Sequence, residues 1–284
     1  MLVPEPRTAA RTRRSAVRVL ALGGTGSVGR WVVTEALEAG HEVVALVRDV
    51  DRARAVLPSE VRFVEGDLTT GAGIAEAVRD VEAIVATLDG DARLVDFGGM
   101  LRVLRAIRDR RVHLVIMSAI GVANVGQGDL LDWKRRGERL VRASGHDFTI
   151  ARPGWFDMQS ADHQSLHLFQ GEQRWSMTPD VGVVGRQQIA RVLVGALSSP
   201  ESKGKTFDLV AEVGPAQDEL DPLFAALEAD DPRTADCWWD PDNMPLADEH
   251  AQVLHALAEL STPRVDPDHG VARGISHSTE EPNS

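Results

Sequence analysis

The sequence predicts an α/β fold, a doubly wound parallel sheet with a small C-terminal lobe, from three observations. Short apolar runs alternate with helical patterns over residues 15–153, and the runs are apolar throughout, as strands covered on both faces are. The first run ends in glycines and passes at once into a helical pattern. A second apolar run follows and completes a βαβ unit. These features are typical of the Rossmann fold.

Each element follows from hydrophobic periodicity and from stop signals such as Gly40 and Pro58. We expect strands over residues 17–22, 41–47, 61–65, 81–87, 112–118, 146–151 and 205–210. We expect helices over residues 27–39, 50–57, 72–79, 92–110, 130–143, 187–197 and 247–260. Residues 155–180 and 214–246 are expected to be irregular. The helix over 92–110 would have an apolar face made of Leu94, Val95, Leu101, Leu104 and Ile107.

Four parts are expected along the chain. Residues 1–14 carry four arginines without an apolar core, so they indicate a disordered arm rather than a secretory signal. Residues 15–153 would form a dinucleotide-binding Rossmann core, and residues 154–260 a C-terminal substrate-binding lobe interleaved with it. Residues 261–284 are polar and indicate a disordered tail.

The composition is that of an ordinary soluble globule, with 43% hydrophobic and 26% charged residues. A net charge of −12 argues against general affinity for nucleic acid or anionic membranes, and no apolar run approaches the ~18 residues of a membrane span. The single Cys237 excludes an internal disulfide and fits a cytoplasmic setting. We expect a small-molecule substrate and a monomer or homodimer.

The glycine turn has the spacing G-x-x-G-x-x-G at Gly23, Gly26 and Gly29. Gly23 permits the tight turn, Gly26 lets the backbone approach a phosphate, and Gly29 lets the helix pack close to the strand. Free N–H groups and the dipole at the helix N-terminus favour a pyrophosphate. With a strand before it and a helix after it, the triplet predicts a dinucleotide site.

The residue after the second strand distinguishes the two nicotinamide dinucleotides. An acidic residue there binds the ribose hydroxyls of NAD, whereas an arginine accommodates the 2′-phosphate of NADP. This chain has Arg48, whose guanidinium can bind a phosphate through two parallel hydrogen bonds. In the alternative interpretation Arg48 only solvates the strand end and Asp49 caps the next helix. We predict NADP(H).

The chain resembles the atypical short-chain dehydrogenase/reductases, in particular their NmrA-like, NAD(P)H-binding branch. The resemblance covers roughly residues 15–210 and is carried by LALGGTGSVGRWVV, VVALVRD, VEGDL, DFGGMLRVLRAIRD, VHLVIMSAIGV, WKRRGERLVRASGHDFTIARPGWF and VGRQQIARVLVGALSSPESKGKTFDL. It implies a Rossmann fold and NAD(P)H-dependent oxidoreductase chemistry. Gln188 departs from the family's usual aspartate, and we expect it to affect local capping.

The resemblance also implies a role for each matching position. It implies pyrophosphate binding by the three glycines with Thr25, Ser27 and Val28, and recognition of the 2′-phosphate by Arg48. Asp67 and Leu68 would border the adenine, and Ala86, Thr87 and Leu88 the ribose. Ser118 would lie near the nicotinamide, Lys134 matches the family's helix lysine, and Pro153 and Gly154 would pass the carboxamide.

The chain has no tyrosine, so the family's Tyr-x-x-x-Lys acid is missing, and Leu130 stands four residues before Lys134. Three hypotheses remain. An NADPH-dependent quinone reductase needs no strong acid, because the reduced anion has a phenol-like pKa of ~10 and water can protonate it. Carbonyl or enone reduction would take its proton from Lys134, as the resemblance to isoflavone-reductase-like proteins implies. A nucleotide-binding regulator without turnover would resemble the NmrA-like redox sensors.

Lys134 and Ser118 are the candidate catalytic residues, and both are also candidate cofactor-binding residues, with ribose binding, proton donation or both as the expected role of Lys134. Lys134 can also be one charge of a solvated basic helix face that includes Arg135, Arg136 and Arg139. Ser118 can also simply end a strand. Asp132 or Asp157 would be a proton donor if burial raised its pKa. His113 lies inside a strand and is expected to be packed rather than catalytic.

An aromatic segment follows the sixth strand, with Trp155, Phe156, Met158 and Trp175 as candidate substrate-binding residues. At the carboxyl edge of the sheet such side chains can cover the nicotinamide and a planar substrate, or they can pack the C-terminal lobe. His163 and His167 are four residues apart without an evident third ligand, and we expect no metal.

The residues and the resemblance together predict an NADPH-dependent reductase of an aromatic, quinonoid or carbonyl substrate. The resemblance and the aromatic segment suggest a place in secondary metabolism. The alternative is a non-catalytic, NADP(H)-binding redox regulator.

Overall fold

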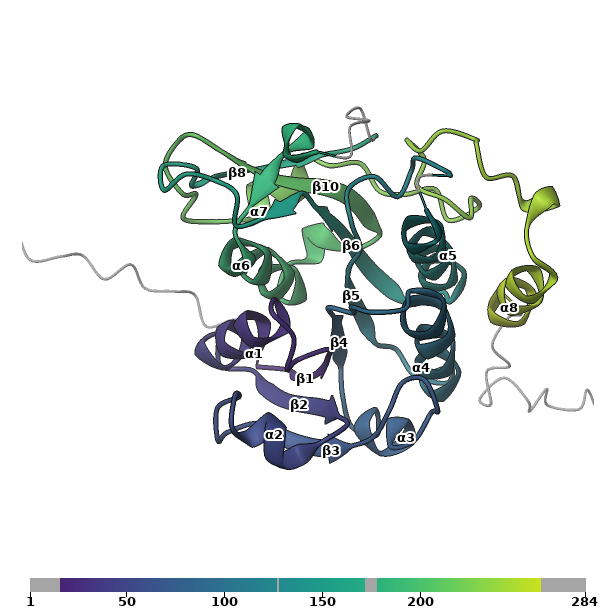
Figure 1. The fold of residues 1–284 in the computed structure, drawn as a ribbon, viewed down its shortest axis with the longest axis horizontal. Coiled ribbons are helices and arrows are strands. Elements are labelled where there is room, and N and C mark those ends of the chain that lie inside the picture. Colours follow the sequence, from purple (N-terminus) through teal and green to yellow (C-terminus); the bar gives the residue numbers. More distant parts are fainter. Residues whose placement is uncertain (1–15, 127, 172–177, 262–284) are drawn as a thin grey trace, which may run out of the picture.

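The structure, a computed structural model, describes residues 16–126, 128–171 and 178–261. Within these ranges a ten-stranded sheet forms the middle layer, and helices cover both of its faces (Figure 1). The predicted α/β fold is confirmed. The predicted arm over residues 1–14 and residues 262–284 of the predicted tail lie outside the described residues, whereas Ser261, the first residue of that tail, ends a helix. None of the described helices is long and apolar enough to cross a membrane.

The first six strands are parallel and lie in the order β3, β2, β1, β4, β5, β6. Their bounds are β1 (Arg18–Leu22), β2 (Glu42–Val47), β3 (Arg62–Glu65), β4 (Ala83–Ala86), β5 (His113–Met117) and β6 (Asp147–Pro153). The strand order reverses between β1 and β4, and doubly wound sheets bind ligands at this switch point. Leu22 of β1 pairs with Leu46 of β2 and Ala86 of β4, so these three strands end together.

Side chains of the strands alternate between two hydrophobic layers. In β1, Val19 and Ala21 face one layer and Leu20 and Leu22 face the other. The first layer holds α1 (Gly29–Glu38), α2 (Val50–Arg54) and α6 (Arg186–Leu197). The second holds α3 (Ile74–Ala77), α4 (Met100–Ala106), α5 (Asp129–Ala143) and α8 (Ala251–Ser261), with α8 outside α4 and α5 (Figure 1).

The predicted elements are present, although several are shorter than expected. Helix α1 begins at Gly29 instead of residue 27, and α2 ends at Arg54 instead of residue 57. Gly40 lies just beyond α1 with φ of +87°, a conformation that favours glycine, so its predicted role as a stop is confirmed.

The prediction of a regular helix over residues 92–110 is wrong for the first half of that segment. Arg93–Gly99 form a π-helical stretch, η1, and only Met100–Ala106 form α4. The wider turn leaves Leu94 52% exposed, contrary to its predicted place on the apolar face, and buries Asp96. π-helical turns are rare and often lie at functional sites.

The region expected to be irregular over residues 155–180 contains strands. These are β7 (Trp155–Phe156) and β8 (Ser165–Phe169), and β9 (Val183–Val184) follows. β8 and β9 pair antiparallel with β10 (Lys205–Glu212), which itself lies parallel to β6. The C-terminal region therefore extends the same sheet. Residues 214–246 also contain a short helix, α7 (Asp221–Ala225).

The basic run of α5 does not form the solvated face that we considered as an alternative. Arg135 and Arg139 are completely buried, and both pair with Asp236, at 3.0 and 2.6 Å. Arg139 also lies 2.7 Å from Glu249. Both carboxylates belong to residues 230–249, which we call the acidic strap. Burial opposes ionisation of Asp236, but the two arginines outweigh it and lower its pKa to about 2.

A second set of buried charges joins α5 to the sheet. Arg152 of β6 donates to Glu138 and to Asp240 of the acidic strap, with contacts of 2.7 Å to each. Arg142 lies 3.1 Å from Glu138 and 3.0 Å from Asp230. Burial alone would raise the pKa of Glu138, but Arg152 and Arg142 lower it to about 2. Breaking one member of such a buried network leaves another charge unpaired, which is strongly destabilising.

These carboxylates predict the acid sensitivity of the fold. A group whose pKa falls on folding contributes stability above its unfolded pKa, and this contribution is lost as the pH falls through the folded pKa. Between about pH 5 and pH 2 we expect the free energy of unfolding to lose roughly 2 to 3 kcal/mol for each of Glu138 and Asp236. Urea denaturation at a series of pH values measures this loss.

The variant Asp236→Asn should be less stable at neutral pH and should show a flatter pH dependence than the parent. Asp51→Asn is the matched control, because the Asp51 carboxylate is exposed and lies 3.6 Å from Arg54. An unchanged pH dependence in Asp236→Asn would contradict the assignment.

Candidate functional site

The glycine turn after β1 begins the site. Gly23 has φ of +77°, and a Cβ there would lie 2.4 Å from the Thr87 carbonyl oxygen. A Cβ at Gly29 would lie 2.1 Å from the Gly23 carbonyl oxygen. Gly26 closes the turn by donating its N–H to that same oxygen at 2.9 Å. The turn therefore requires glycine at positions 23 and 29, as the motif predicts.

The N-terminus of α1 is suited to an anion. No side chain caps it at Val28, and its first turn has no acidic residue. A Cβ at Gly26 would meet only the Gly23 carbonyl oxygen within 4 Å, so a group can approach the outer side of the turn. Thr25 and Ser27 are exposed on the same turn. These features fit the pyrophosphate of a dinucleotide.

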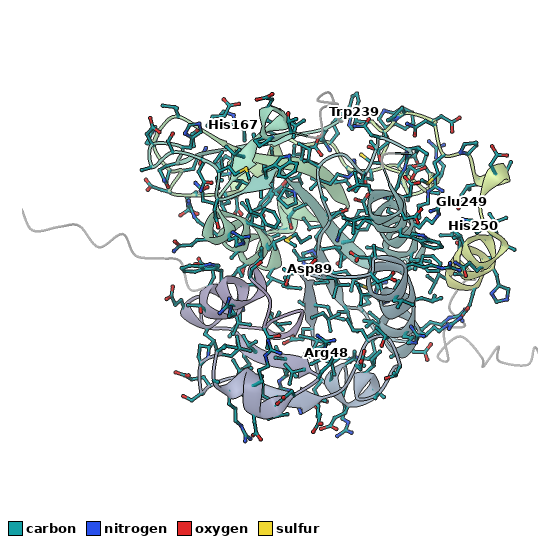
Figure 2. The ribbon with its side chains drawn as sticks, viewed as in Figure 1. Arg48, Asp89, His167, Trp239, Glu249 and His250 are labelled. Atoms are coloured by element: carbon teal, nitrogen blue, oxygen red, sulfur yellow. The ribbon has the colours of Figure 1, made fainter. Side chains whose placement is uncertain are left out.

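Arg48 follows β2 at the same edge of the sheet and is exposed (Figure 2). The Asp49 carboxylate accepts a backbone N–H at 2.9 Å and caps α2, so that part of the alternative interpretation is confirmed. Asp67, after β3, accepts two hydrogen bonds of 2.7 Å from Thr69, and these lower the pKa of Asp67. The charges of Arg48 and Arg102 lower it further, so two guanidinium groups act on this part of the edge.

The other residues predicted to line the nucleotide lie at the carboxyl ends of their strands. Leu68 lies beyond β3, Ala86 ends β4 and is followed by Thr87 and Leu88, Ser118 follows β5, and Pro153 ends β6 and is followed by Gly154. The parallel sheet brings all of them to one edge. Their contacts with a nucleotide stay predictions.

Lys134 lies on the side of α5 that faces η1, with only 9% of its side chain exposed. Its Nζ lies 2.7 Å from Asp96 Oδ1 and 3.5 Å from the Leu88 carbonyl oxygen. Burial raises the pKa of Asp96, although the charge of Lys134 opposes that rise. A Cβ at Gly137 would lie 2.6 Å from the Asp96 carbonyl oxygen, so glycine is what lets α5 approach η1 this closely.

Ser118 and Glu138 lie beside this pair, and all four side chains line one cavity of about 10 Å³. A cavity of this size approaches the volume that one water needs. The buried Ser118 hydroxyl has no hydrogen bond of normal geometry within the described structure, yet it is near enough to Glu138 to add to the lowering of that carboxyl's pKa by Arg152. The two candidate catalytic residues thus share a cavity, and their roles remain predictions.

Sequence reasoning misses Asp96 and Glu138. Asp96 enters the site because η1 departs from regular helical spacing, which hydrophobic periodicity does not reveal. Glu138 lies four residues after Lys134 in a helix, so the two share a face, and this spacing could have identified it.

The predicted substrate-binding residues lie beyond Gly154. Trp155 and Phe156 form β7 beside β9, and Trp155 and Met158 are 37% and 58% exposed. The Arg186 guanidinium covers the Phe156 ring, 5.2 Å from its centroid. Phe156 is therefore packed, whereas Trp155 and Met158 are accessible. Trp175 lies outside the described residues.

Neither aspartate considered as a proton donor is buried. Asp157 is exposed and pairs with Arg186, and Asp132 is only half-buried. His113 is buried and lies 3.1 Å from the Thr149 hydroxyl, and burial lowers the pKa of His113 to about 4. Its predicted packing role is confirmed.

His163 and His167 make separate contacts. His163 lies 2.7 Å from the Ser160 hydroxyl, and His167 stacks on Phe169 with 6.1 Å between ring centroids. Where side chains are described, no group of three or more His, Cys, Asp or Glu residues is placed to hold a metal ion. Gln188 accepts the N–H of the residue before α6 at 2.8 Å, which confirms its predicted effect on capping.

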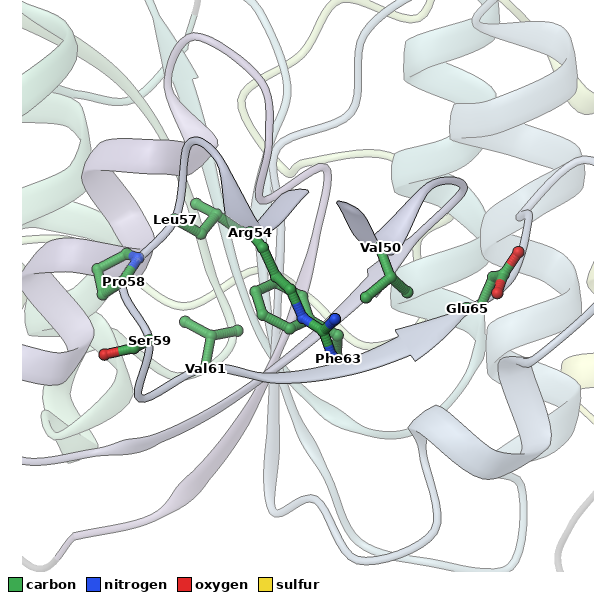
Figure 3. A pocket seen from close by; sticks show the side chains of 8 residues that line it. All are labelled: Val50, Arg54, Leu57, Pro58, Ser59, Val61, Phe63 and Glu65. Carbon is green, nitrogen blue, oxygen red and sulfur yellow. The ribbon is translucent and has the colours of Figure 1, made fainter. Parts of the chain in front are cut away.

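A larger recess of about 640 Å³ lies apart from Lys134, between α2 and the edge strand β3 (Figure 3). Its lining side chains are Val50, Arg54, Leu57, Pro58, Ser59, Val61, Phe63 and Glu65. None of the residues predicted to bind the nucleotide or to react lines it.

Comparison with protein families finds a match over residues 23–200 to a family described as NAD(P)H-binding. The photosystem II assembly factor Ycf39 of Synechocystis sp. is 26% identical over 204 residues, which cover 68% of this chain and 62% of Ycf39. This chain thus spans less than two thirds of that relative's length. The NAD(P)H azoreductase of Xenophilus azovorans is 26% identical over 213 residues, covering 74% of this chain and 73% of the azoreductase.

Comparison with solved structures finds a similar fold in a putative NAD-dependent epimerase/dehydratase from Bacillus halodurans. The TM-score is 0.62 at 22% identity, and the match covers 75% of this chain and 100% of that chain. At this identity the likeness shows the fold alone.

The geometry of the turn predicts how two glycine variants differ. Gly26→Ala should retain its thermal midpoint within a few degrees and lose roughly tenfold or more in NADPH affinity, because its methyl group occupies the space for the phosphate. Gly145→Ala is the control: Gly145 has φ of +67° and no atom near its missing Cβ. It should lose about 1 to 2 kcal/mol of stability and no affinity.

Thermal denaturation and titration with NADPH measure the two properties. Equal NADPH affinity in Gly26→Ala and the parent would show that the phosphate does not approach this turn.

Proposed function

Because the chain belongs to the NAD(P)H-binding family, which confirms its resemblance to the atypical short-chain dehydrogenase/reductases, we propose that it is an NADPH-dependent reductase. Its acceptor is an aromatic, quinonoid or carbonyl compound. The coarser activity, NAD(P)H-dependent oxidoreductase, is that of the family.

The observation that carries this proposal is a buried lysine in a site that lacks tyrosine. The chain has 31 basic residues, and all of them are arginines except Lys134, Lys203 and Lys205. Lys134 is followed by two arginines. Lysine can release its proton, whereas arginine stays protonated in proteins. The place of Lys134 beside Ser118 at the carboxyl edge supports a role in the reaction.

The class of acceptor determines whether the site must donate a proton to the reduced product. Water can protonate the phenol-like anion of a reduced quinone, whereas a reduced ketone is far more basic and needs a positioned donor. Trp155 is exposed beside the predicted nicotinamide position and offers a flat apolar surface to a planar acceptor. The similarity to an NAD(P)H azoreductase also supports reduction of an organic acceptor.

A second candidate is a nucleotide-binding protein without turnover. The observation that favours it is the similarity to Ycf39, which is named an assembly factor rather than a reductase. This candidate predicts tight NADPH binding and no consumption of NADPH.

A panel of quinones, aryl ketones, enones and azo compounds separates these candidates. NADPH consumption is followed by absorbance, with NADH in place of NADPH as the control. Turnover with any acceptor class supports the reductase. Tight NADPH binding without turnover across the whole panel would contradict it and favour the second candidate.

Arg48 predicts the choice of nucleotide. A guanidinium that binds the 2′-phosphate contributes a charge-assisted hydrogen bond, so Arg48→Asp should weaken NADPH binding roughly tenfold to a hundredfold and change NADH binding much less. Arg62→Asp is the control, because Arg62 is exposed at the opposite end of the sheet, at the start of β3. Equal losses for both nucleotides in Arg48→Asp would remove the reason for choosing NADP.

A further inference from the structure

We propose that Asn124, in the loop after β5, recognises the organic acceptor by pairing its side-chain amide with a lactam, a ring N–H next to a C=O. This inference rests on the proposed reductase function and names the class of acceptor. The expected substrate is thus a planar compound that carries a lactam beside its reducible bond.

The Asn124 side chain is buried without a partner. It is 4% exposed, and both Nδ2 and Oδ1 lack a hydrogen bond within the described structure. Among the described buried side chains with more than one polar atom, Asn124 is the one in which every such atom is both buried and unpaired. Burial removes the water that would otherwise pair with an amide, so buried amides nearly always have partners. An amide with neither atom paired indicates that a group from outside the chain supplies them.

The backbone beside Asn124 is held by α5 and the acidic strap. The Ala123 carbonyl oxygen accepts a hydrogen bond from Asn243 Nδ2 at 2.9 Å and another from Arg135 Nη1 at 3.4 Å. Arg135 also donates to Asn243 Oδ1 at 2.6 Å, so these three residues contact one another. The chain fixes the residue before Asn124 and leaves the amide itself unpaired, which is the arrangement of a preorganised binding group.

The loop also contacts the segment that carries Trp155. The Ile120 N–H donates to the Pro153 carbonyl oxygen at 3.1 Å, and Trp155 begins β7 just beyond. Loop and segment both follow parallel strands at the carboxyl edge of the sheet, where folds of this kind bind ligands (Figure 1). Val125, the residue after Asn124, is 36% exposed, so the amide lies within one residue of the surface. Two adjoining segments thus offer an acceptor a flat apolar surface and an amide.

The charges beside the loop favour a neutral ligand. Each guanidinium nitrogen of Arg135 already donates to an acceptor in the acidic strap. The Asp132 carboxylate accepts the Gly126 N–H at 3.3 Å, and this negative charge disfavours an anion. A neutral group that both donates and accepts hydrogen bonds is therefore the suitable partner for Asn124.

The chemistry of the amide selects a lactam. A primary amide has N–H donors and an acceptor oxygen in one plane, and asparagine forms two hydrogen bonds with a ring edge that offers a donor beside an acceptor. A lactam has such an edge, whereas a simple quinone or aryl ketone has only acceptor oxygens. Those compounds would leave Asn124 Oδ1 unpaired, and a site with a buried polar atom left unpaired discriminates against such a ligand.

Binding without turnover tests the amide first. 2-Quinolone is a planar lactam, and N-methyl-2-quinolone is the same ring without the N–H donor. Calorimetric titration of the full chain, with and without saturating NADP⁺, measures both affinities. The parent should bind 2-quinolone about tenfold or more tightly than its N-methyl form. Equal affinities, or no binding of either compound in both titrations, would overturn the proposal.

Asn124→Leu keeps the approximate volume of the side chain and removes both polar atoms. It should bind the two quinolones equally, and its thermal midpoint should stay close to that of the parent, because the amide makes no contact in the protein that could be lost. Val125→Ala, which changes the exposed neighbour, is the matched control and should keep the preference for 2-quinolone. A preference that survives in Asn124→Leu would show that Asn124 does not bind the lactam.

A matched pair of acceptors tests the same contact in turnover. Isatin carries a reducible ketone beside its lactam, and its reduction adds the hydride of NADPH to C3 and a proton to the C3 oxygen. N-Methylisatin lacks the N–H donor. The parent should reduce isatin with a kcat/KM about tenfold or more above that for N-methylisatin, and Asn124→Leu should bring this ratio close to one.

The nicotinamide carboxamide has the same hydrogen-bonding edge as a lactam, and NADPH affinity distinguishes the two sources. Asn124→Leu should bind NADPH as the parent does. If it loses NADPH affinity and keeps the parent's ratio between the two isatins, the amide binds the nucleotide and the proposal is wrong.

The proposed function and the role of Asn124 fail in different ways. If the parent binds NADPH and reduces no acceptor, the proposed function is wrong, and the quinolone titrations still decide the role of Asn124. If the parent reduces quinones but does not distinguish the two isatins or the two quinolones, only the role of Asn124 is wrong.

Discussion

Helix α5 keeps its place because the charges of its buried arginines are matched inside the protein. Removing a guanidinium from water costs several kcal/mol unless a carboxylate pairs with it, and Arg135 and Arg139 are completely buried. The acidic strap supplies Asp236 and Glu249 as partners, and Figure 2 shows Glu249 where the strap meets α8. The helix cannot slide along the sheet without separating these pairs. The position of Lys134 on the same helix depends on them.

Arginine and lysine have different tasks along this helix. Arginine stays charged at every accessible pH and forms several directed hydrogen bonds, so it suits fixed contacts such as the pair between Arg139 and Asp236. Lysine can release its proton, and Lys134 is the lysine of this helix. It lies beside Leu88 and Ser118, which follow β4 and β5, and the resemblance implies that the nicotinamide lies near Ser118. Structural charges and the candidate reactive charge are therefore carried by different side chains.

The parts of the molecule that sequence could predict are those with local causes. The turn from Gly23 to Gly29 depends on contacts within a few residues, and its glycines, its strand and its helix are all visible in one short stretch. The acidic strap is different, since Arg139 and Asp236 are 97 residues apart and their pairing depends on the path of the whole C-terminal region. Asp96 also escapes prediction, because its inward position requires a π-helical turn that hydrophobic periodicity cannot represent. The glycine turn of the candidate site could therefore be predicted from the sequence, whereas the position of Asp96 and the contacts of the acidic strap could not.

In the proposed reductase, this edge of the sheet transfers a hydride from a bound nicotinamide to an organic acceptor. The most direct measurement is the fate of deuterium carried at the nicotinamide C4 of NADPH, with each of the two C4 positions labelled in turn. One of the two labels should leave the nucleotide and the other should stay in NADP⁺, which mass spectrometry of NADP⁺ detects. With a ketone or enone, which takes the hydride at carbon, the label that leaves should appear in the reduced acceptor. If NADPH binds tightly and neither label leaves the nucleotide with any acceptor, the site binds the nucleotide without using it, and the proposed hydride transfer is wrong.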